Sequence, residues 1–356
     1  MNHLSQRVTI EVLGEFQDRI DTRTPAEFAE DHLPGAHSHP VLSNEERARV
    51  GTIYARESSF AAKKVGAALI ARNIAAMLES AFADRPRDWR PLVYCWRGGK
   101  RSAALVHVLN EVGWKAKQLE GGYKTYRRWV RQHVESLPAQ FSYCVVCGLT
   151  GSGKSRLLHA LAAEGAQVLD LEALGAHKGS LLGDLPQAPQ PSQKAFETHI
   201  VDTLSRFDPA HPVFVESESV RLGQLRVPER LIAAMWASPC LRVELELTGR
   251  VALLKEEYVH FLRDPQALVD RLQRLLPLHG RTVLEDWRAA VRAGDWDSLI
   301  GDLLKRHYDP AYTRSMKAHY PRYDAADTLT VRRHDPAEFA RLARMLCEAE
   351  LIEAAR

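Results

Sequence analysis

The chain has 356 residues, of which 45% are hydrophobic and 26% are charged, and its net charge is +3. This composition indicates a globular protein with two domains, because one ordinary core does not absorb so long a chain. No apolar run reaches the length of a membrane span, which excludes a membrane-spanning protein. An odd set of five cysteines, and first residues without the apolar core of a signal peptide, favour a cytoplasmic protein with free thiols.

Basic residues gather in one stretch of the chain. Residues 84–131 contain 12 Lys and Arg against 4 Asp and Glu. Such an excess suits phosphate groups, including a nucleic-acid backbone, or forms an ordinary solvated surface.

Residues 1–136 are predicted to form an α/β domain. A helix is expected behind Thr24, with Pro25 at its first position and Glu27 three residues after the cap. The other elements expected in chain order are strands at 8–13 and 19–22, a helical region at 44–80, a buried strand at 92–94, a helix at 103–112 ended by Gly113, a turn at 120–123 and a basic helix to about residue 133.

Residues 137–356 are predicted to form a second domain, entered through a linker at 136–140. Its expected elements are strands at 141–147, 167–170, 212–215 and 241–247, helices at 153–163 and 195–207, and a loop at 175–192. Alternating strands and helices predict a parallel sheet covered on both faces. The α/β core is expected over about 137–248 and a mostly helical tail over about 249–356.

The strand expected at 92–94 stops at a cysteine, and a loop rich in glycine and cations follows. Backbone N–H groups, the next helix N-terminus and the cations all favour a negatively charged sulfur, and Ser102 can cap that helix. The glycines let the N–H groups converge on one anion. The candidate residues are the nucleophile Cys95 and the anion-binding loop Trp96, Arg97, Gly98, Gly99, Lys100, Arg101 and Ser102.

This loop resembles the active-site loop of the rhodanese superfamily, whose members carry sulfur or selenium on the cysteine. Segments 21–28, 33–37 and 120–123 resemble other signatures of that fold. Five residues separate Cys95 from Arg101, one more than in small sulfurtransferases, which leaves room for a tetrahedral anion. Cysteine phosphatases of this fold share the spacing, but Tyr94 replaces the His that usually precedes their cysteine. On the loop alone, chalcogen transfer, phosphatase-like chemistry and an inert regulatory copy remain open.

A second phosphate-binding signature, G-x-x-x-x-G-K-[ST], lies between a predicted strand and a predicted helix. Its N–H groups cradle a diphosphate, Lys154 reaches the outer phosphate and Ser155 can ligate Mg²⁺. Asp170 and Glu216 end apolar strands and are candidate acidic partners of a metal or a reacting group, or ordinary carboxylates. The diphosphate-binding candidates are Gly148, Thr150, Gly151, Ser152, Gly153, Lys154 and Ser155.

No dedicated metal site is expected from the cysteines and histidines. Cys144 and Cys147 have the C-x-x-C spacing but lie on one strand, where alternation points their side chains to opposite faces. No second pair lies nearby, and the fifteen histidines show no metal-binding pattern. Both thiols are therefore expected to be buried.

The whole chain resembles the bacterial tRNA 2-selenouridine synthase family, in which a rhodanese-like domain is fused to a P-loop domain. Besides the two loops, the resemblance rests on segments 168–172, 177–180, 190–197 and 215–219, and it departs at Lys178, where Arg is expected. It implies the α/β fold class: a rhodanese-like parallel-sheet domain, then a P-loop α/β domain with a helical C-terminal part.

The resemblance also implies the reaction. Family members replace the sulfur of 2-thiouridine at the tRNA wobble position with selenium from selenophosphate, after geranyl diphosphate has placed a geranyl group on that sulfur. Cys95 would take selenium as a selenopersulfide or otherwise promote its delivery, and the P-loop would hold the departing diphosphate without ATP. No bound prosthetic group and no obligatory protein partner are implied, while Mg²⁺ is compatible with the P-loop.

Three arginines are candidate contacts to the anticodon region of tRNA. Arg127, Arg128 and Arg131 are interleaved with aromatic residues that could stack on an unpaired base, or they belong to a basic helix packed on its own domain.

Two alternative functions also remain: a P-loop kinase or NTPase with a rhodanese-like sulfur-transfer or regulatory module, and an RNA-binding protein with vestigial sites. Intact Cys95 and Lys154 argue against the last.

Overall fold

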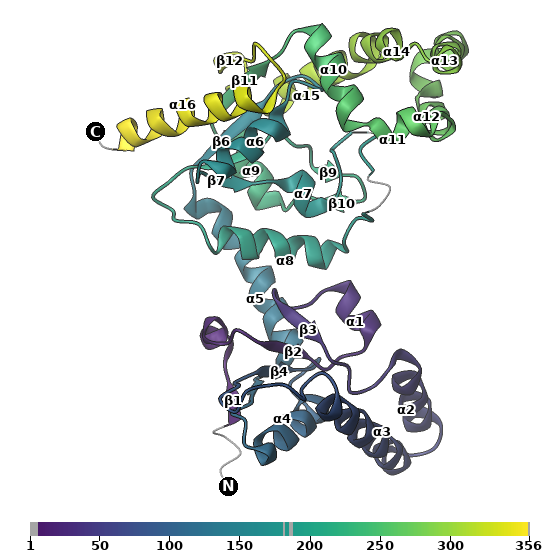
Figure 1. Ribbon diagram of the computed structural model, residues 1–356, viewed down its shortest axis with the longest axis vertical. Coiled ribbons are helices and arrows are strands. Elements are labelled where there is room, and N and C mark those ends of the chain that lie inside the picture. Colours follow the sequence, from purple (N-terminus) through teal and green to yellow (C-terminus); the bar gives the residue numbers. More distant parts are fainter. Residues whose placement is uncertain (1–5, 181, 185–187, 355–356) are drawn as a thin grey trace. The chain divides into compact units, whose positions relative to one another are not determined.

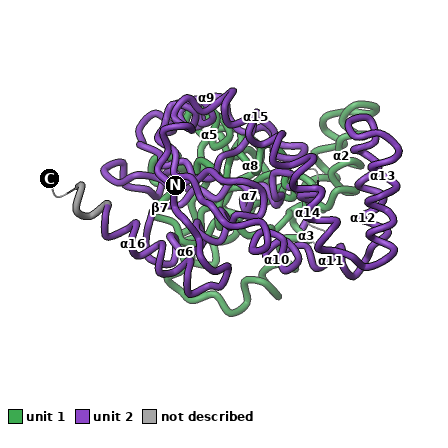
Figure 2. The backbone as a smooth tube through the Cα atoms, turned by 90° about the horizontal axis from the view of Figure 1, so that it is seen from above, with its two compact units in different colours: residues 1–133, 191–202 green, residues 134–190, 203–356 purple. Residues whose placement is uncertain are grey.

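The computed structural model describes residues 6–180, 182–184 and 188–354. The start of the chain, where no signal-peptide core was found, and part of the predicted loop at 175–192 lie outside these residues. The chain divides into two compact units, coloured separately in Figure 2. The first contains residues 1–133 and 191–202, and the second contains residues 134–190 and 203–356.

The first unit is built on a five-stranded parallel sheet with the strand order β1-β5-β4-β2-β3 (Figure 1). The strand that ends at the cysteine, Leu92–Tyr94, is fully buried at the centre of this sheet. It is hydrogen-bonded to a neighbouring strand along each edge. The predicted strand at 8–13 is mostly wrong, because the chain turns into a 3-10 helix after two strand residues. The strands are β1 (Arg7–Val8), β2 (Arg19–Asp21), β3 (Ala36–Ser38), β4 (Leu92–Tyr94) and β5 (Lys117–Leu119).

Helices cover this sheet. The predicted capping box is confirmed: Thr24 accepts from the backbone N–H of Glu27, whose carboxylate accepts from the backbone of Thr24. Gly113 has φ 110° and ends its helix as predicted. The helices are η2 (Ile10–Glu15), α1 (Pro25–Glu30), α2 (Asn44–Arg56), α3 (Ser59–Glu79), α4 (Lys100–Val112), α5 (Gly122–Ser136), which runs on into the second unit, and most of α8 (Gln193–Leu204).

The second unit contains another five-stranded parallel sheet, with the strand order β12-β11-β6-β8-β7. Both sheets are thus parallel, and the predicted α/β fold class with a helical C-terminal part is confirmed. A two-stranded antiparallel hairpin lies beside the second sheet. The strands are β6 (Tyr143–Cys147), β7 (Gln167–Leu169), β8 (Val213–Glu216), β9 (Arg221–Leu222), β10 (Leu225–Arg226), β11 (Cys240–Glu244) and β12 (Asp327–Thr330).

The strand β12 was missed because it lies within the tail predicted to be helical. The tail is otherwise helical, and its last helix packs its apolar face on α6 through Phe339, Leu342 and Ala343. The helices are η3 (Leu137–Gln140), α6 (Lys154–Ala163), α7 (Leu171–Gly175), α9 (Glu229–Ala237), α10 (Leu247–Glu257), α11 (Val259–Arg263), α12 (Pro265–Leu272), η4 (Gln273–Leu275), α13 (Leu276–Ala293), α14 (Trp296–Leu303), η5 (Leu304–Tyr308), α15 (Asp309–His319) and α16 (Pro336–Ala354).

The predicted linker at 136–140 is helical. It forms the end of α5 and then η3, and both Leu137 and Pro138 are buried. The chain returns to the first unit once more, at Pro191–Asp202. There Lys194 forms an ion pair with Glu30 of α1, so the start of α8 is tied to α1 by charge.

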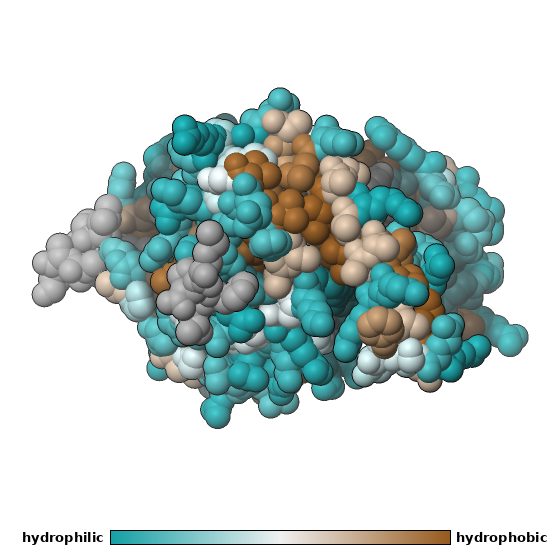
Figure 3. Space-filling model, turned by 90° about the horizontal axis from the view of Figure 1, so that it is seen from below, coloured by the Kyte–Doolittle hydropathy of each residue, from teal (hydrophilic) through white to brown (hydrophobic). Residues whose placement is uncertain are grey.

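The face drawn in Figure 3 is mostly hydrophilic, with hydrophobic residues exposed in places. Large exposed apolar side chains include Tyr54 and Phe60, near the turn between α2 and α3, and Leu278 on α13. Among the described residues, no helix combines the length and the apolar character needed to cross a bilayer.

Candidate functional site

Cys95 lies directly after β4, at the carboxyl end of a central strand, where parallel sheets form their sites. Its thiol is almost fully buried and accepts two hydrogen bonds. The backbone N–H of Gly99 donates to Sγ over 3.2 Å, and the hydroxyl of Ser102 donates over 3.1 Å. Gln118 Nε2 in turn donates to Ser102 Oγ and to the carbonyl of Gly99. The sulfur is therefore held in place by a fixed set of hydrogen-bond donors.

The loop can close around the sulfur because of two glycines. Gly98 has φ +60°, and a Cβ there would lie 2.7 Å from the carbonyl oxygen of Leu119. Gly122, at the start of α5, also has positive φ, and a Cβ there would collide with the carbonyl oxygen of Cys95. Because Gly122 has no side chain, the start of α5 can approach the loop. Tyr123 N then donates to the carbonyl of Cys95 over 2.9 Å.

Helix α4 begins at Lys100, with Gly99 as its N-cap. The expectation that Ser102 caps this helix is therefore wrong: its buried side chain binds the sulfur and the carbonyl of Gly99. The first N–H groups of a helix have no carbonyl partner within it, so those of α4 remain available to an anion beside Cys95.

The three cations of the loop have different roles in the structure. Arg101 forms an ion pair with Glu27 over 2.9 Å, which fixes its guanidinium beside the loop. Within the described residues, Arg97 and Lys100 are exposed and form no ion pair. These two are the cations that an incoming anion could recruit without displacing a carboxylate.

Tyr94 stands behind the loop, where cysteine phosphatases have a histidine. It is fully buried, and its hydroxyl accepts from the backbone N–H of Leu33 over 3.2 Å. Burial raises the pKa of Tyr94 well above its ordinary value, so the phenol stays neutral. A buried ion pair between Arg23 and Asp21, 2.6 Å long, packs close by and fixes the ends of the neighbouring strands.

The three arginines predicted to contact tRNA are not equivalent. Arg127 is half-buried, forms an ion pair with Glu197 and donates to the carbonyl of Lys194, so it joins α5 to α8 inside the first unit. Arg128 and Arg131 are exposed. Sequence reasoning could not separate them, because the partner of Arg127 lies 70 residues away.

The P-loop occupies the carboxyl end of β6, the central strand of the second sheet. Lys154 Nζ donates to the carbonyl of Gly148 over 2.7 Å and lies 5.2 Å from the ring centroid of Tyr312. Tyr312 also accepts from the backbone N–H of Gly148 over 2.7 Å. A tyrosine of the helical tail, 164 residues further along the chain, thus holds the first residue of the loop; nothing in the sequence pattern pointed to it.

Left-handed glycines shape the rest of the loop. Gly151 and Gly153 have φ +80° and +90°, and a Cβ on either would clash with Leu254 or Phe339. Arg250, almost fully buried, donates to the carbonyl of Thr150 and forms a bidentate pair with Asp309. The helical tail therefore sets the shape of the P-loop.

Three carboxylates meet beside the P-loop. Oxygen atoms of Glu172, Glu216 and Glu218 lie within 4.8 Å of one another, and Ser155 Oγ donates to Glu172 over 3.1 Å. Of the two predicted acidic partners, Glu216 belongs to this cluster. Asp170 caps α7 by accepting from Ala173 N and also contacts His159.

The carboxylates repel one another and are buried. Burial raises the pKa of Glu172 to about 7 and that of Glu218 to about 8, and the charge of Lys154 opposes both shifts. Burial and the two neighbouring carboxylates hold the pKa of Glu216 well above its ordinary value. One oxygen of Glu216 is buried without a hydrogen-bond partner among the described residues. This oxygen-only donor set, close to the P-loop serine, fits a hard divalent cation such as Mg²⁺.

A cavity of about 270 Å³ opens over the P-loop and the carboxylates. A smaller apolar pocket of about 70 Å³ adjoins it, since five residues line both: Thr150, Ser180, Leu254, Tyr258 and Tyr308. Apart from Lys255, the other residues that line the apolar pocket are apolar, and all but Leu182 belong to the helical tail: Leu182, Phe261, Leu262, Leu268, Trp296, Leu299, Ile300, Leu303 and Leu304.

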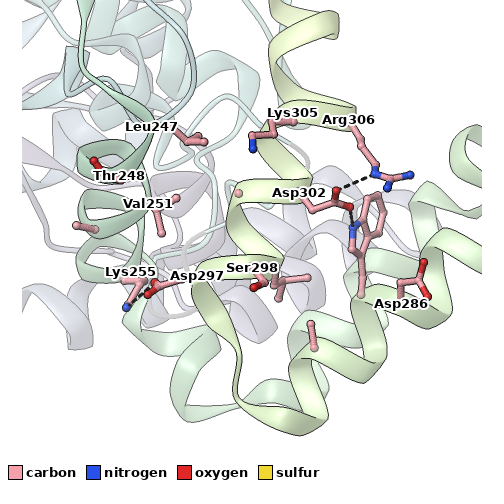
Figure 4. A pocket seen from close by; sticks show the side chains of 15 residues that line it. Leu247, Thr248, Val251, Lys255, Asp286, Asp297, Ser298, Asp302, Lys305 and Arg306 are labelled. Carbon is pink, nitrogen blue, oxygen red and sulfur yellow. Dashed lines mark hydrogen bonds and ion pairs between the residues drawn. The ribbon is translucent and has the colours of Figure 1, made fainter.

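A third hollow of about 760 Å³ lies on another face of α10, between that helix, α13, α14 and η5 (Figure 4). Its charges are largely paired within the wall. Lys255 binds Asp297 over 2.7 Å, and Asp302 accepts from both Arg306 and Trp287. Two of the cations that line this hollow, Lys255 and Arg306, are thus paired with carboxylates of its own wall.

The fold and the two loops define a protein class in which a rhodanese-like domain is joined to a P-loop domain. The model of the rhodanese-like domain family matches residues 11–128, and the model of the tRNA 2-selenouridine synthase AAA domain matches residues 141–271. The chain belongs to the tRNA 2-selenouridine synthase family.

Named relatives cover most of the chain. The tRNA 2-selenouridine synthase of Nitrosomonas europaea is 34% identical over 74% of this chain and 69% of its own length. That of Hydrogenovibrio crunogenus is 31% identical over 84% and 89%, and that of Chromohalobacter salexigens is 36% identical over 82% and 86%. Among solved structures, a rhodanese-related protein from Thermoplasma volcanium is 17% identical, covers 36% of this chain and 92% of its own, and has a TM-score of 0.22.

Proposed function

We propose that the protein is a cytoplasmic tRNA-modifying transferase that replaces the sulfur of wobble 2-thiouridine with selenium from selenophosphate. An S-geranylated tRNA, made from geranyl diphosphate, is the proposed intermediate. The observation that supports this proposal is the presence in one chain of two loops of different chemistry: one with a buried thiol, and a P-loop whose cavity adjoins an apolar pocket.

The P-loop cavity suits geranyl diphosphate for two reasons. N–H groups at the start of α6 and the ammonium of Lys154 match a diphosphate. The adjoining apolar pocket, walled by leucine, isoleucine and aromatic side chains, gains free energy when it takes up a hydrocarbon chain rather than water. A nucleotide would place a polar ribose and base where this wall is apolar.

Alkylation prepares the base for exchange. The thiocarbonyl sulfur of the tRNA attacks the first carbon of the geranyl group, the carbon–oxygen bond breaks, and diphosphate leaves with the electron pair. Lys154 offsets the charge that develops on the leaving oxygen. The alkylated sulfur then leaves the base as a thiolate more readily than it would as bare sulfide.

Mg²⁺ would be held by Glu172, Glu216 and Glu218 with the hydroxyl of Ser155, since these oxygens meet beside the cradle. A bound cation would neutralise part of the charge of the departing diphosphate. The carboxylates would lose their mutual repulsion when they share a cation.

Selenophosphate is assigned to the Cys95 loop. The first N–H groups of α4 match its oxyanion, as do Arg97 and Lys100, which form no ion pair with any residue that the structure describes. Cys95 would then take up selenium or promote its delivery to the alkylated base.

The test is an incubation of the protein with thiolated tRNA, geranyl diphosphate and selenophosphate, followed by mass spectrometry of the nucleosides. Wild type should yield S-geranyl-2-thiouridine and 2-selenouridine. Cys95→Ser should retain geranylation but lose selenium incorporation, whereas Lys154→Ala should impair geranylation first. Equal loss of both products in Cys95→Ser would contradict the division of labour. Saturable ATP turnover indifferent to tRNA would favour a P-loop kinase or NTPase instead.

A further inference from the structure

The chemistry of Cys95 is constrained by its loop. We propose that the Cys95 thiolate attacks the phosphorus of selenophosphate, forming S-phosphocysteine and releasing hydrogen selenide for the tRNA. This inference rests on the proposed function and specifies how its selenium donor is opened. Selenium would therefore never be bonded to the cysteine.

The first argument is the placement of the sulfur relative to the anion donors. Sγ lies at the base of the loop, fixed by Gly99 N at 3.2 Å and Ser102 Oγ at 3.1 Å. The free N–H groups at the start of α4 and the fixed guanidinium of Arg101 border the same loop. Donors of this kind bind phosphate oxygens, which leaves phosphorus as the atom presented to the sulfur.

The second argument is electron balance. In selenophosphate, selenium is at the oxidation level of selenide, and it has the same level in 2-selenouridine. A selenopersulfide on Cys95 would hold selenium two electrons more oxidised, so making it would require an oxidant or would release phosphite. Attack on phosphorus needs neither.

The proposed steps balance without a redox partner. The sulfur–phosphorus bond forms as the phosphorus–selenium bond breaks, and hydrogen selenide leaves with the electron pair. Water then cleaves S-phosphocysteine to phosphate and the free thiolate. Hydrogen selenide adds to C2 of the S-geranylated base, and the geranyl thiolate leaves with the electrons of the carbon–sulfur bond.

The third argument concerns the leaving group. Burial raises the pKa of Glu27, but the hydrogen bonds from Arg101 and the backbone of Thr24, with the charges of Arg101 and Arg23, together lower it below its ordinary value, so the carboxyl is ionised. Tyr94 is buried, with its hydroxyl bound to the backbone of Leu33. Neither group is placed to protonate a leaving atom. Hydrogen selenide leaves as a weakly basic anion and needs no such proton, whereas an alkoxide does.

The test compares two selenium donors on tRNA that has already been geranylated. With selenophosphate, Cys95→Ser should lose 2-selenouridine formation, while with hydrogen selenide under anaerobic conditions it should regain the wild-type rate. Cys347→Ser is the matched control and should behave as wild type with both donors. In acid-quenched wild type, the peptide containing Cys95 should carry the mass of one phosphoryl group.

Two results would overturn the inference. One is failure of hydrogen selenide to rescue Cys95→Ser while wild type uses both donors. The other is a selenium adduct, in place of the phosphoryl group, on the trapped peptide. Wild type that installs selenium from neither donor would instead refute the proposed function, so the two failures are distinguishable.

Discussion

Replacing Glu218 by glutamine is expected to stabilise the second unit at neutral and alkaline pH in the absence of divalent cations. Glu218 is buried beside Glu172 and Glu216, and the charge of Lys154 offsets their repulsion in part. Glutamine keeps the shape and can still accept from Ser219 N, the bond that the glutamate makes over 3.3 Å. The change therefore removes the titrating charge and little else.

The size and the sign of the effect on the free energy of unfolding follow from the pKa of Glu218. Burial raises the pKa of Glu218 from 4.5 to about 8, so the folded protein holds a proton that the unfolded chain releases. Stability is therefore lost as pH rises from 4.5 towards 8. At pH 7 the carboxyl therefore destabilises the fold by about 3 kcal/mol. Below pH 4.5 the carboxyl is neutral in both states and contributes nothing.

The assay is urea unfolding in EDTA at about pH 5, 7 and 8.5, followed by hydrogen exchange in peptides covering β6 and β8. The gain in unfolding free energy of Glu218→Gln should be small at pH 5 and grow with pH. Excess Mg²⁺ should then stabilise wild type more than the variant, because wild type offers the full carboxylate set. An equal gain at all three pH values would refute the reasoning.

Three further outcomes are expected. Ser102→Ala removes a donor to the sulfur and should slow selenium transfer about ten-fold or more, with geranylation unchanged in single-turnover assays. Leu262→Trp narrows the apolar pocket and should raise the KM for geranyl diphosphate, while inhibition by inorganic diphosphate stays the same. Joint replacement of Arg128 and Arg131 by alanine should lower the slope of log Kd for tRNA against log salt by up to about 2. Arg127→Ala should leave that slope unchanged and lower the melting temperature instead, since Arg127 is paired with Glu197.

The two loops could be predicted from sequence because their requirements are local. A buried strand, a cysteine, glycines with room to take positive φ and a following helix all lie within a dozen residues. The capping box at Thr24 is of the same kind. The strand predicted at 8–13 is mostly wrong, although apolar residues alternate there as they do in a strand. Alternation in the sequence does not show whether a partner strand continues beside the segment.

The rest of the site depends on contacts between distant parts of the chain. Glu172 lies on a helix and Glu218 follows a strand. The local sequence around each of these residues therefore does not mark it as a neighbour of Ser155. Tyr312 and the walls of the apolar pocket come from a tail that sequence reasoning described only as helical. The edge strand β12 was missed because it is only four residues long and lies between helices. So short a segment shows no clear alternation of apolar and polar residues.

The return of the chain at Pro191–Asp202 has a consequence for the order of folding. Asp31 of the first unit accepts from Tyr123 on α5 over 2.7 Å and from Thr198 on α8 over 3.2 Å. During synthesis, the first unit therefore cannot complete this buried cluster until the P-loop strand β6 has already left the ribosome. The two units mature in an interleaved order. A fragment ending at residue 136 would keep Tyr123 but lack Thr198, the second donor to Asp31, and Glu197, the ion-pair partner of Arg127.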